Sequence, residues 1–174
     1  MKNKLLIVIG VFLSLSVKAH IVLESQEAIA GSYYKAVFKV GHGCDGSSIN
    51  SIVVEIPNGF KGAKPMVKPG WNAAIEKSTL AKSYTSHGKT ISEDVSKITW
   101  TGGNLPASFY DEFVVVGQLP DQAGSLYWKV KQICEKGEIY WNEIPAPGKT
   151  VKDYKEPAAL LQVLPAEEHS HHGH

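Results

Sequence analysis

The sequence predicts an all-β fold, an antiparallel β-sandwich. Many short segments are rich in β-branched and aromatic residues, and Gly, Pro and Asn separate them. No long stretch has the 3.6-residue hydrophobic period of a helix. Short strands in this number, without helices between them, are typical of two antiparallel sheets packed face to face.

The expected strands follow the alternation of apolar and polar residues. The clearest is 125–134, in which Leu126, Trp128 and Val130 alternate with polar or charged neighbours. The segments expected as strands are 21–23, 33–40, 50–57, 97–101, 109–120, 125–134 and 138–145, with 71–83 as a strand or loop rather than a helix. We expect a turn at Gly102-Gly103-Asn104 and a mobile tail where the composition changes after residue 145.

Residues 1–19 have the pattern of a secretory signal peptide. Lys2 and Lys4 give a basic start, an apolar run follows over 5–15, and Ala19 is a small residue of the type that precedes a cleavage site. The apolar run is about eleven residues long, whereas a membrane-spanning helix needs about 20. We therefore expect cleavage after Ala19 rather than a retained anchor. The mature protein would be periplasmic or otherwise extracytoplasmic, with one domain over 20–165.

Charge and cysteine content narrow the function classes. The formal net charge is +1, and cleavage removes three lysines and no acid, which leaves a slightly acidic mature chain. Nucleic-acid binding calls for a clustered basic surface, so we expect no nucleic-acid partner. The chain has two cysteines, Cys44 and Cys134, and in an oxidising compartment such a pair is most simply a disulfide. It would close a loop of about 90 residues and contribute roughly 4–5 kcal/mol in the chain-entropy model.

Cleavage after Ala19 would make His20 the first residue of the mature chain. An N-terminal histidine can chelate a metal through its α-amino group and its Nδ1 atom, which an internal histidine cannot do. An amine and an imidazole in one plane suit the tetragonal coordination of copper(II). The free amine has a pKa of about 7.7–8.0, so metal binding displaces a proton and weakens as the pH falls.

Several motifs, in their order along the chain, resemble one known family. They are His20, "GSYYKAVFKVGHGCDGSS" (31–48), "KPMVKPGW" (64–71), "YDEF" (110–113) and "CEKGEIYWNEIP" (134–145). Up to about Pro165 the mature chain resembles the YcnI-like copper-binding domain family of exported bacterial proteins. The resemblance implies an immunoglobulin-like or fibronectin-like sandwich that binds one copper(II) ion per chain through a single-histidine brace.

Carried over by motif, the resemblance implies His20 and Glu112 as metal ligands and Trp141 as the aromatic residue beside the metal. It also implies copper handling without catalysis. The expected partner is a copper-transport membrane protein or another periplasmic copper chaperone.

The alternation of the strand alone does not select the carboxylate. Glu112 shares a face with Tyr110, whereas Asp111 shares the other face with Phe113, so each acid lies between apolar neighbours. Glu24 is a third candidate, because the same alternation places it on the side of His20. The family motif selects Glu112.

Other metal-like or aromatic features have simpler explanations. His42, in "GHGCDG", is expected to be a hydrogen-bonded structural residue in a tight bend, and His87 an exposed loop residue. Trp100 and Trp128 are expected in the core, while Trp71 is a second aromatic candidate for a wall of the site. The tail 166–174 has four histidines in its last six residues and either collects metal loosely or only solubilises the chain end.

Three function classes remain. The first is a non-enzymatic copper(II) chaperone or storage protein in copper homeostasis. The second is an oxidative enzyme of the histidine-brace type, similar to lytic polysaccharide monooxygenases, although that chemistry needs a second histidine. The third is an adhesion or interaction sandwich whose terminal histidine has no metal role.

Overall fold

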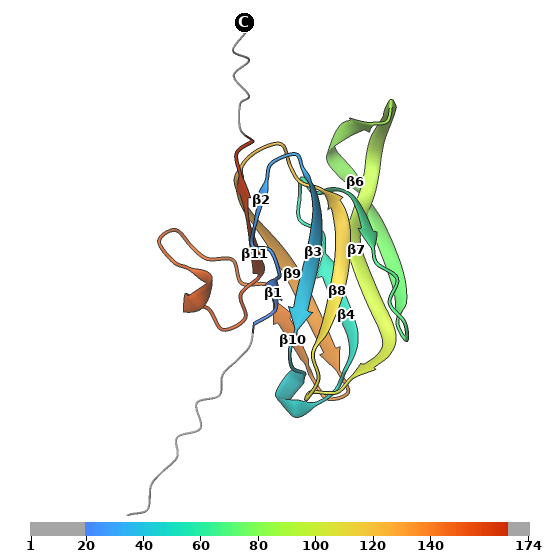
Figure 1. Cartoon of the computed structure of the whole chain (residues 1–174), viewed down its shortest axis with the longest axis vertical. Helices are drawn as coiled ribbons and strands as arrows, with labels where there is room; N and C mark the ends of the chain where they lie inside the picture. Colours follow the sequence, from blue (N-terminus) through green and yellow to red (C-terminus); the bar gives the residue numbers. More distant parts are fainter. Residues whose placement is uncertain (1–19, 167–174) are drawn as a thin grey trace, which may run out of the picture.

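The computed structural model describes residues 20–166, which form eleven β-strands and two 3-10 helices in a two-layer arrangement (Figure 1). The predicted signal peptide, 1–19, lies outside the described residues, as does the predicted His-rich tail apart from Ala166. In the described part of the chain, no helix is long and apolar enough to cross a membrane.

The smaller sheet has four strands in the order β1-β3-β8-β5. Their bounds are β1 Val22–Leu23, β3 Tyr33–Val40, β8 Asp111–Gln118 and β5 Lys61–Pro65. All pairings in this sheet are antiparallel. In β3 and β8 the inner face carries fully buried residues such as Phe38 and Phe113, and the outer face carries Lys39 and Glu112. The alternation that predicted these two strands is confirmed.

The larger sheet has the order β2-β11-β9-β4-β7-β6, with β10 also paired to β9. Their bounds are β2 Glu27–Ile29, β11 Ala159–Leu164, β9 Gly124–Cys134, β4 Ile49–Glu55, β7 Lys89–Leu105, β6 Asn72–Ser86 and β10 Glu138–Trp141. β9 pairs with β11 over Gly124–Trp128 and with β10 over Val130–Ile133. The two short strands therefore follow one another along the same edge of β9.

Aromatic rings fill the space between the sheets. Trp128 packs edge-on against Phe38 at 5.4 Å and against Phe60 at 4.8 Å between ring centroids. Trp100 packs against Phe113 at 5.4 Å. Edge-to-face pairs of this kind add to the large apolar area that each ring buries. The predicted antiparallel sandwich is confirmed, and so is the placement of Trp100 and Trp128 in its core.

Two sequence-based expectations about strand ends were wrong. The segment Gly102-Gly103-Asn104 is not a turn, because β7 continues to Leu105. A Cβ atom on Gly103 would lie 2.0 Å from the Trp71 ring, so glycine here lets an indole pack directly on a strand backbone. The chain after residue 145 is not one mobile tail either. β11 is an inner strand between β2 and β9, with Leu161 fully buried.

The disulfide between Cys44 and Cys134 is confirmed, with a Cα–Cα distance of 6.0 Å and a sequence separation of 90. Cys44 begins the 3-10 helix η1 (Cys44–Gly46), which follows β3 of the smaller sheet. Cys134 is the last residue of β9 in the larger sheet. The bond therefore ties one end of the sandwich together across its two layers. The second 3-10 helix, η2 (Val151–Asp153), lies in the connection from β10 to β11.

We expect the double substitution Cys44→Ala/Cys134→Ala to lower the free energy of unfolding by about 4 kcal/mol, because it removes a cross-link that closes a long loop. Urea denaturation followed by tryptophan fluorescence measures the change. Wild-type protein treated with a thiol reductant is the control and should show the same loss. Equal stability of the double variant and the oxidised wild type would contradict a structural role for this bond.

Candidate functional site

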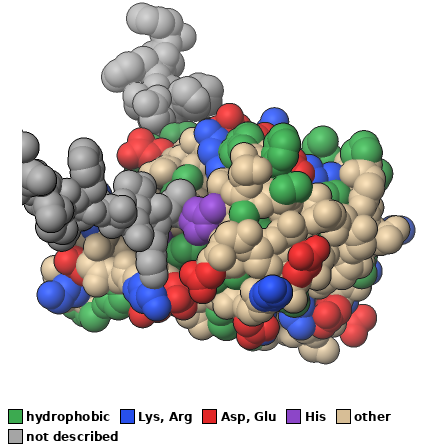
Figure 2. Space-filling view, turned by 90° about the horizontal axis from the view of Figure 1, so that it is seen from below, with side chains coloured by type: hydrophobic (Ala, Val, Ile, Leu, Met, Phe, Trp, Pro, Cys, Tyr) green, Lys and Arg blue, Asp and Glu red, His purple; other side chains and the backbone are tan. Residues whose placement is uncertain are grey.

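The candidate site lies at the end of the sandwich where β1 begins, η1 turns and β10 ends (Figure 1). His20 is partly buried, and its ring lies 5.6 Å from the Trp141 ring between centroids, tilted by 59°. The ring of His42 lies 6.4 Å from the same indole, close to edge-on at 68°. Figure 2 looks at this end and shows histidine at the surface among acidic and hydrophobic side chains. The structure thus brings two histidines to one tryptophan.

Trp141 is held in place from two directions. As the last residue of β10 it pairs with Val130 of β9, and only 2% of its surface is exposed. Its indole N–H donates a hydrogen bond to Oε1 of Gln132, and Gln132 is buried at 1% exposure. Nε2 of Gln132 donates in turn to the backbone carbonyl of His42 at 2.9 Å. The two contacts determine the orientation of the amide, with its oxygen toward Trp141 and its nitrogen toward His42. One buried side chain therefore positions both Trp141 and the turn that carries His42.

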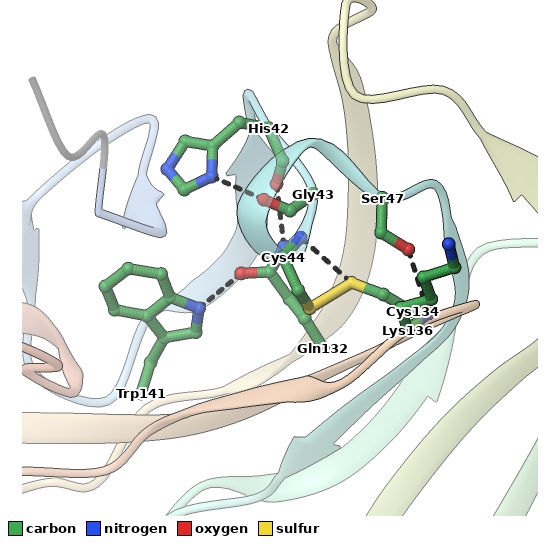
Figure 3. Close-up of a disulfide and its surroundings, with 8 residues drawn as sticks. All are labelled: His42, Gly43, Cys44, Ser47, Gln132, Cys134, Lys136 and Trp141. Atoms are coloured by element: carbon green, nitrogen blue, oxygen red, sulfur yellow. Dashed lines mark hydrogen bonds between the residues drawn. A yellow bond between two sulfur atoms is a disulfide. The ribbon is translucent and has the colours of Figure 1, made fainter. Parts of the chain in front are cut away.

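The turn that carries His42 needs its glycines. A Cβ atom on Gly43 would lie 1.7 Å from the carbonyl oxygen of Ser47, so no other residue fits there without moving the turn. Within the turn, Asp45 has a φ of 46°, a value that short polar residues tolerate. The backbone N–H of Cys44 donates to the sulfur of Cys134 at 3.0 Å (Figure 3). The predicted bend is confirmed, and the disulfide fastens it to β9.

Glu112 is the second residue of β8 in the smaller sheet. It is on the outer face of the smaller sheet, where the register pairs it with Lys39, and Lys39 is paired in turn with Val22 of β1. Its carboxylate accepts a hydrogen bond from the Tyr110 hydroxyl. That hydrogen bond, with desolvation and the charges of nearby acids, raises the pKa of Tyr110 to about 12. The ladder therefore places Lys39 between Glu112 and the strand that begins after His20.

The two alternative carboxylates are already paired with lysines. Asp111 makes an ion pair with Lys68 at 2.6 Å and also accepts the backbone N–H of Glu112 at 2.8 Å. Glu24 lies 3.9 Å from Lys39 with half of its side chain exposed, a pair of small energetic weight. Glu112 differs from both because its carboxylate contact is a neutral hydroxyl. Trp71, the second aromatic candidate, packs edge-on against Phe113 at 4.9 Å.

Within residues 20–166, no three His, Cys, Asp or Glu side chains are grouped so that they alone could hold a metal ion. The brace that the sequence suggests is of another kind, because one of its donors is a backbone amine. In the full-length chain that nitrogen belongs to the peptide bond between Ala19 and His20. The α-amine and Nδ1 of His20 can therefore act together as metal ligands only after the chain is cleaved between Ala19 and His20.

The sequence was compared with models of known protein families. The model described as "Domain of unknown function (DUF1775)" matches residues 20–163. The chain belongs to the DUF1775 family. A comparison with curated proteins gave no significant match. Among solved structures, a similar chain is that of an uncharacterized protein from Nocardia farcinica, whose crystal structure is described as revealing an immunoglobulin-like fold. It is 20% identical, covers 83% of this chain and 97% of its own, and has a TM-score of 0.62. At 20% identity this similarity is evidence for the fold of the DUF1775 domain alone.

Sequence reasoning missed Gln132, although the sequence holds a signal for it. Gln132 continues the buried series Trp128 and Val130 along β9, so a polar amide occupies a position where an apolar residue is expected. A buried amide must have hydrogen-bond partners. Its partners lie in segments far along the chain, which a strand pattern cannot identify.

We expect Gln132→Met to lower the free energy of unfolding of the DUF1775 domain by about 2–6 kcal/mol, because two buried polar groups lose their partner at roughly 1–3 kcal/mol each. The indole N–H resonance of Trp141 should also move upfield in the proton NMR spectrum. The matched control is Gln162→Met, which removes an exposed hydrogen bond to Ser125 and should change stability by less than about 0.5 kcal/mol. Equal effects of the two substitutions would contradict the bridging role of Gln132.

Proposed function

We propose that this DUF1775 protein is a copper(II)-binding protein of copper homeostasis that holds one ion per chain at its processed N-terminus. The observation that carries the proposal is the position of His20. The residue that follows the signal-like segment lies partly buried against Trp141, at an end of the sandwich held by a disulfide. The resemblance to the YcnI-like copper-binding proteins supports the same proposal, because members of that family carry the DUF1775 domain.

The chemistry depends on cleavage after Ala19. Cleavage turns the amide nitrogen of His20 into a primary amine, and this amine and Nδ1 of the same residue can then close a chelate ring. Two neutral nitrogens in a plane favour copper(II) over metals that prefer oxygen ligands. Copper binding must release the amine proton, so the affinity should fall as the pH drops below about 7.7–8.0.

The surroundings of His20 would shape the site. Trp141 is held on two sides, because Gln132 accepts its indole N–H and β9 pairs with its backbone. An indole next to the metal would shield one side from water and could interact with a cation through its ring face. Glu112 remains the proposed oxygen donor, and its negative charge would offset part of the charge of copper(II). For Glu112 to reach the same ion, the freed N-terminus must lie toward the outer face of the smaller sheet.

A protein of this kind would bind copper and pass it on rather than catalyse a reaction. The proposed partner is a copper-transport membrane protein or a second periplasmic copper chaperone, and the proposed location is extracytoplasmic. An oxidative enzyme is the alternative, and oxygen consumption in the presence of a reductant and a polysaccharide distinguishes it from a carrier.

We expect mature protein that starts at His20 and ends at Pro165 to bind one equivalent of copper(II) tightly. The same protein with one alanine ahead of His20 should bind roughly 100-fold more weakly or worse, because the amine no longer shares a chelate ring with the imidazole. Titration against a competing chelator measures both affinities. Ending the chain at Pro165 removes the tail histidines and leaves β11 complete. Equal affinity of the two proteins would eliminate the brace.

We expect Glu112→Gln to weaken copper(II) binding by about 10–100-fold, the range found when groups that support a metal site are removed. The pKa of Tyr110 should fall from about 12 toward its usual 10, which reports that the exchange took effect in a folded protein. Glu138→Gln is the matched control, because it makes the same charge change at an exposed residue paired with Lys131 at 2.8 Å. An unchanged copper affinity, together with the lowered pKa of Tyr110, would transfer the role to Asp111 or Glu24.

A further inference from the structure

A pocket of about 650 Å³ lies at the end of the sandwich opposite His20, lined by the segments 58–61, 80–84 and 120–122. We call it the hairpin pocket, because one wall belongs to the β6–β7 hairpin, which extends past the ends of the other strands in Figure 1. The register of β3 aligns β1 with the first residues of β8, whereas the pocket follows the last residues of β8. Its volume is within the range of about 300–1,000 Å³ that is usual for small-molecule sites.

Irregular pairing in two strands shapes the hairpin pocket. In β6 the register passes from Thr79 opposite Glu93 to Tyr84 opposite Ile91, so four residues of β6 lie against one of β7. β5 has a second irregularity in its pairing with β8, next to Gly62 with a φ of 63°. β5 and β6 are each the last strand of their sheet. Bulges bend a strand and redirect its side chains, and here one lies on each side of the same pocket.

Asp94 of β7 connects the two sides of the hairpin pocket. It is 8% exposed, and its carboxylate accepts hydrogen bonds from the Tyr84 hydroxyl at 2.7 Å and from the backbone N–H of Gly62 at 2.8 Å. Tyr84 belongs to the larger sheet and Gly62 to the smaller sheet. Desolvation and the hydrogen bond to Asp94 raise the pKa of Tyr84 to about 12. The phenol is therefore neutral at pH 7 and adds no negative charge to the pocket.

Much of the lining is apolar. Phe60 is 5% exposed and packs edge-on against Trp128 at 4.8 Å between ring centroids. A Cβ atom on Gly117 would lie 2.4 Å from the Phe60 ring, so glycine at this position gives the ring its space. The other apolar contributions come from Leu80, Ala81, Pro120 and the ring of Tyr84. A surface of this kind suits the hydrocarbon or aromatic part of a ligand.

Among the described lining residues, three carry a charge: Lys61, Lys82 and Asp121. Lys61 pairs with Asp121 at 2.7 Å, and its Nζ atom lies 5.9 Å from the centroid of the Tyr84 ring. Lys82 is exposed and makes no ion pair within residues 20–166. The lining thus has one more positive than negative charge. A cation beside an apolar pocket favours a ligand with one acidic group.

We propose that the hairpin pocket binds a small amphipathic anion, whose aromatic or aliphatic body packs against Phe60 and Tyr84 while its acidic group pairs with Lys82. This inference goes beyond the proposed copper function and does not depend on it. Lys61 is held by Asp121 and by the ring of Tyr84, so Lys82 is the cation left to pair with a ligand.

Two-dimensional NMR with a matched pair of compounds tests this class of ligand. The sample is isotopically labelled protein from His20 to the C-terminus without added copper, and the probes are 2-naphthoate and its neutral analogue 2-naphthamide. Both compounds should shift the backbone amide resonances of Lys61, Tyr84 and Gly117. 2-Naphthoate should bind about 2–5-fold more tightly than 2-naphthamide, which is the size of effect expected from an exposed ion pair.

Three variants separate the charge from the apolar lining. Lys82→Ala should remove the preference, so that both compounds bind with equal affinity and still shift the pocket resonances. Lys89→Ala is the matched control, because Lys89 is an exposed lysine of the same hairpin that does not line the pocket, and it should keep the preference. Leu80→Ser should weaken both compounds to a similar extent, because it removes apolar lining without a change of charge.

Equal affinity of the wild type for the two compounds, or shifts that fall away from the three lining segments, would overturn the proposal. Circular dichroism checks that each variant folds. If Leu80→Ser does not fold, the comparison of Lys82→Ala with Lys89→Ala decides, because both lysines are exposed. No copper is present in these measurements, so failure of the proposed copper function would leave this inference standing, and the reverse also holds.

Discussion

The side-chain amide of Gln132 connects the parts of the candidate site. It accepts the indole N–H of Trp141 and donates to the carbonyl of His42, and it is almost fully buried. Breaking either contact would leave a polar group without a partner in the interior, which costs more than an ordinary surface hydrogen bond contributes. The nearby disulfide removes the remaining freedom, because it fixes the turn to the end of β9. This end of the sandwich is thus held by a buried amide and a disulfide, and His20 is the residue whose backbone nitrogen the proposed cleavage would change.

Much of the fold could be predicted from local pattern. The alternation in 125–134 and 109–120 identified β9 and β8, because each has one face in the core and one in water. The disulfide was predicted from two cysteines that follow a segment with the pattern of a signal peptide. The failures have physical causes. Gly102 and Gly103 resemble a turn, yet they lie in a strand where an indole needs the space of a missing Cβ. β11 was overlooked because prolines and charged residues precede it, although its apolar residues are buried by β2 and β9.

The candidate site was predictable only in part. His20 became a candidate through the predicted cleavage after Ala19, and Trp141 and Glu112 through motif resemblance. None of these routes could show that His42 would face Trp141, since the contact depends on how a loop after β3 meets the end of β10. The strand pattern shows that Gln132 is a polar residue at a position expected to be buried. Its hydrogen-bond partners, however, are set by tertiary contacts that the pattern does not contain. A polar residue in an apolar series identifies a network without identifying its members.

Glu112 and His42 are held in different ways near the start of the mature domain. The ring of His42 is next to Trp141 already, with Nδ1 satisfied by Gly43. The carboxylate of Glu112 accepts a hydrogen bond from the exposed Tyr110 hydroxyl, which it would have to leave in order to bind a metal at His20. As the proposed oxygen donor, a carboxylate on the outer face would suit a later contact, when a partner draws the ion away. Since His20 would be the mobile ligand, copper would leave through movement of the chain end, with the rest of the sandwich unchanged.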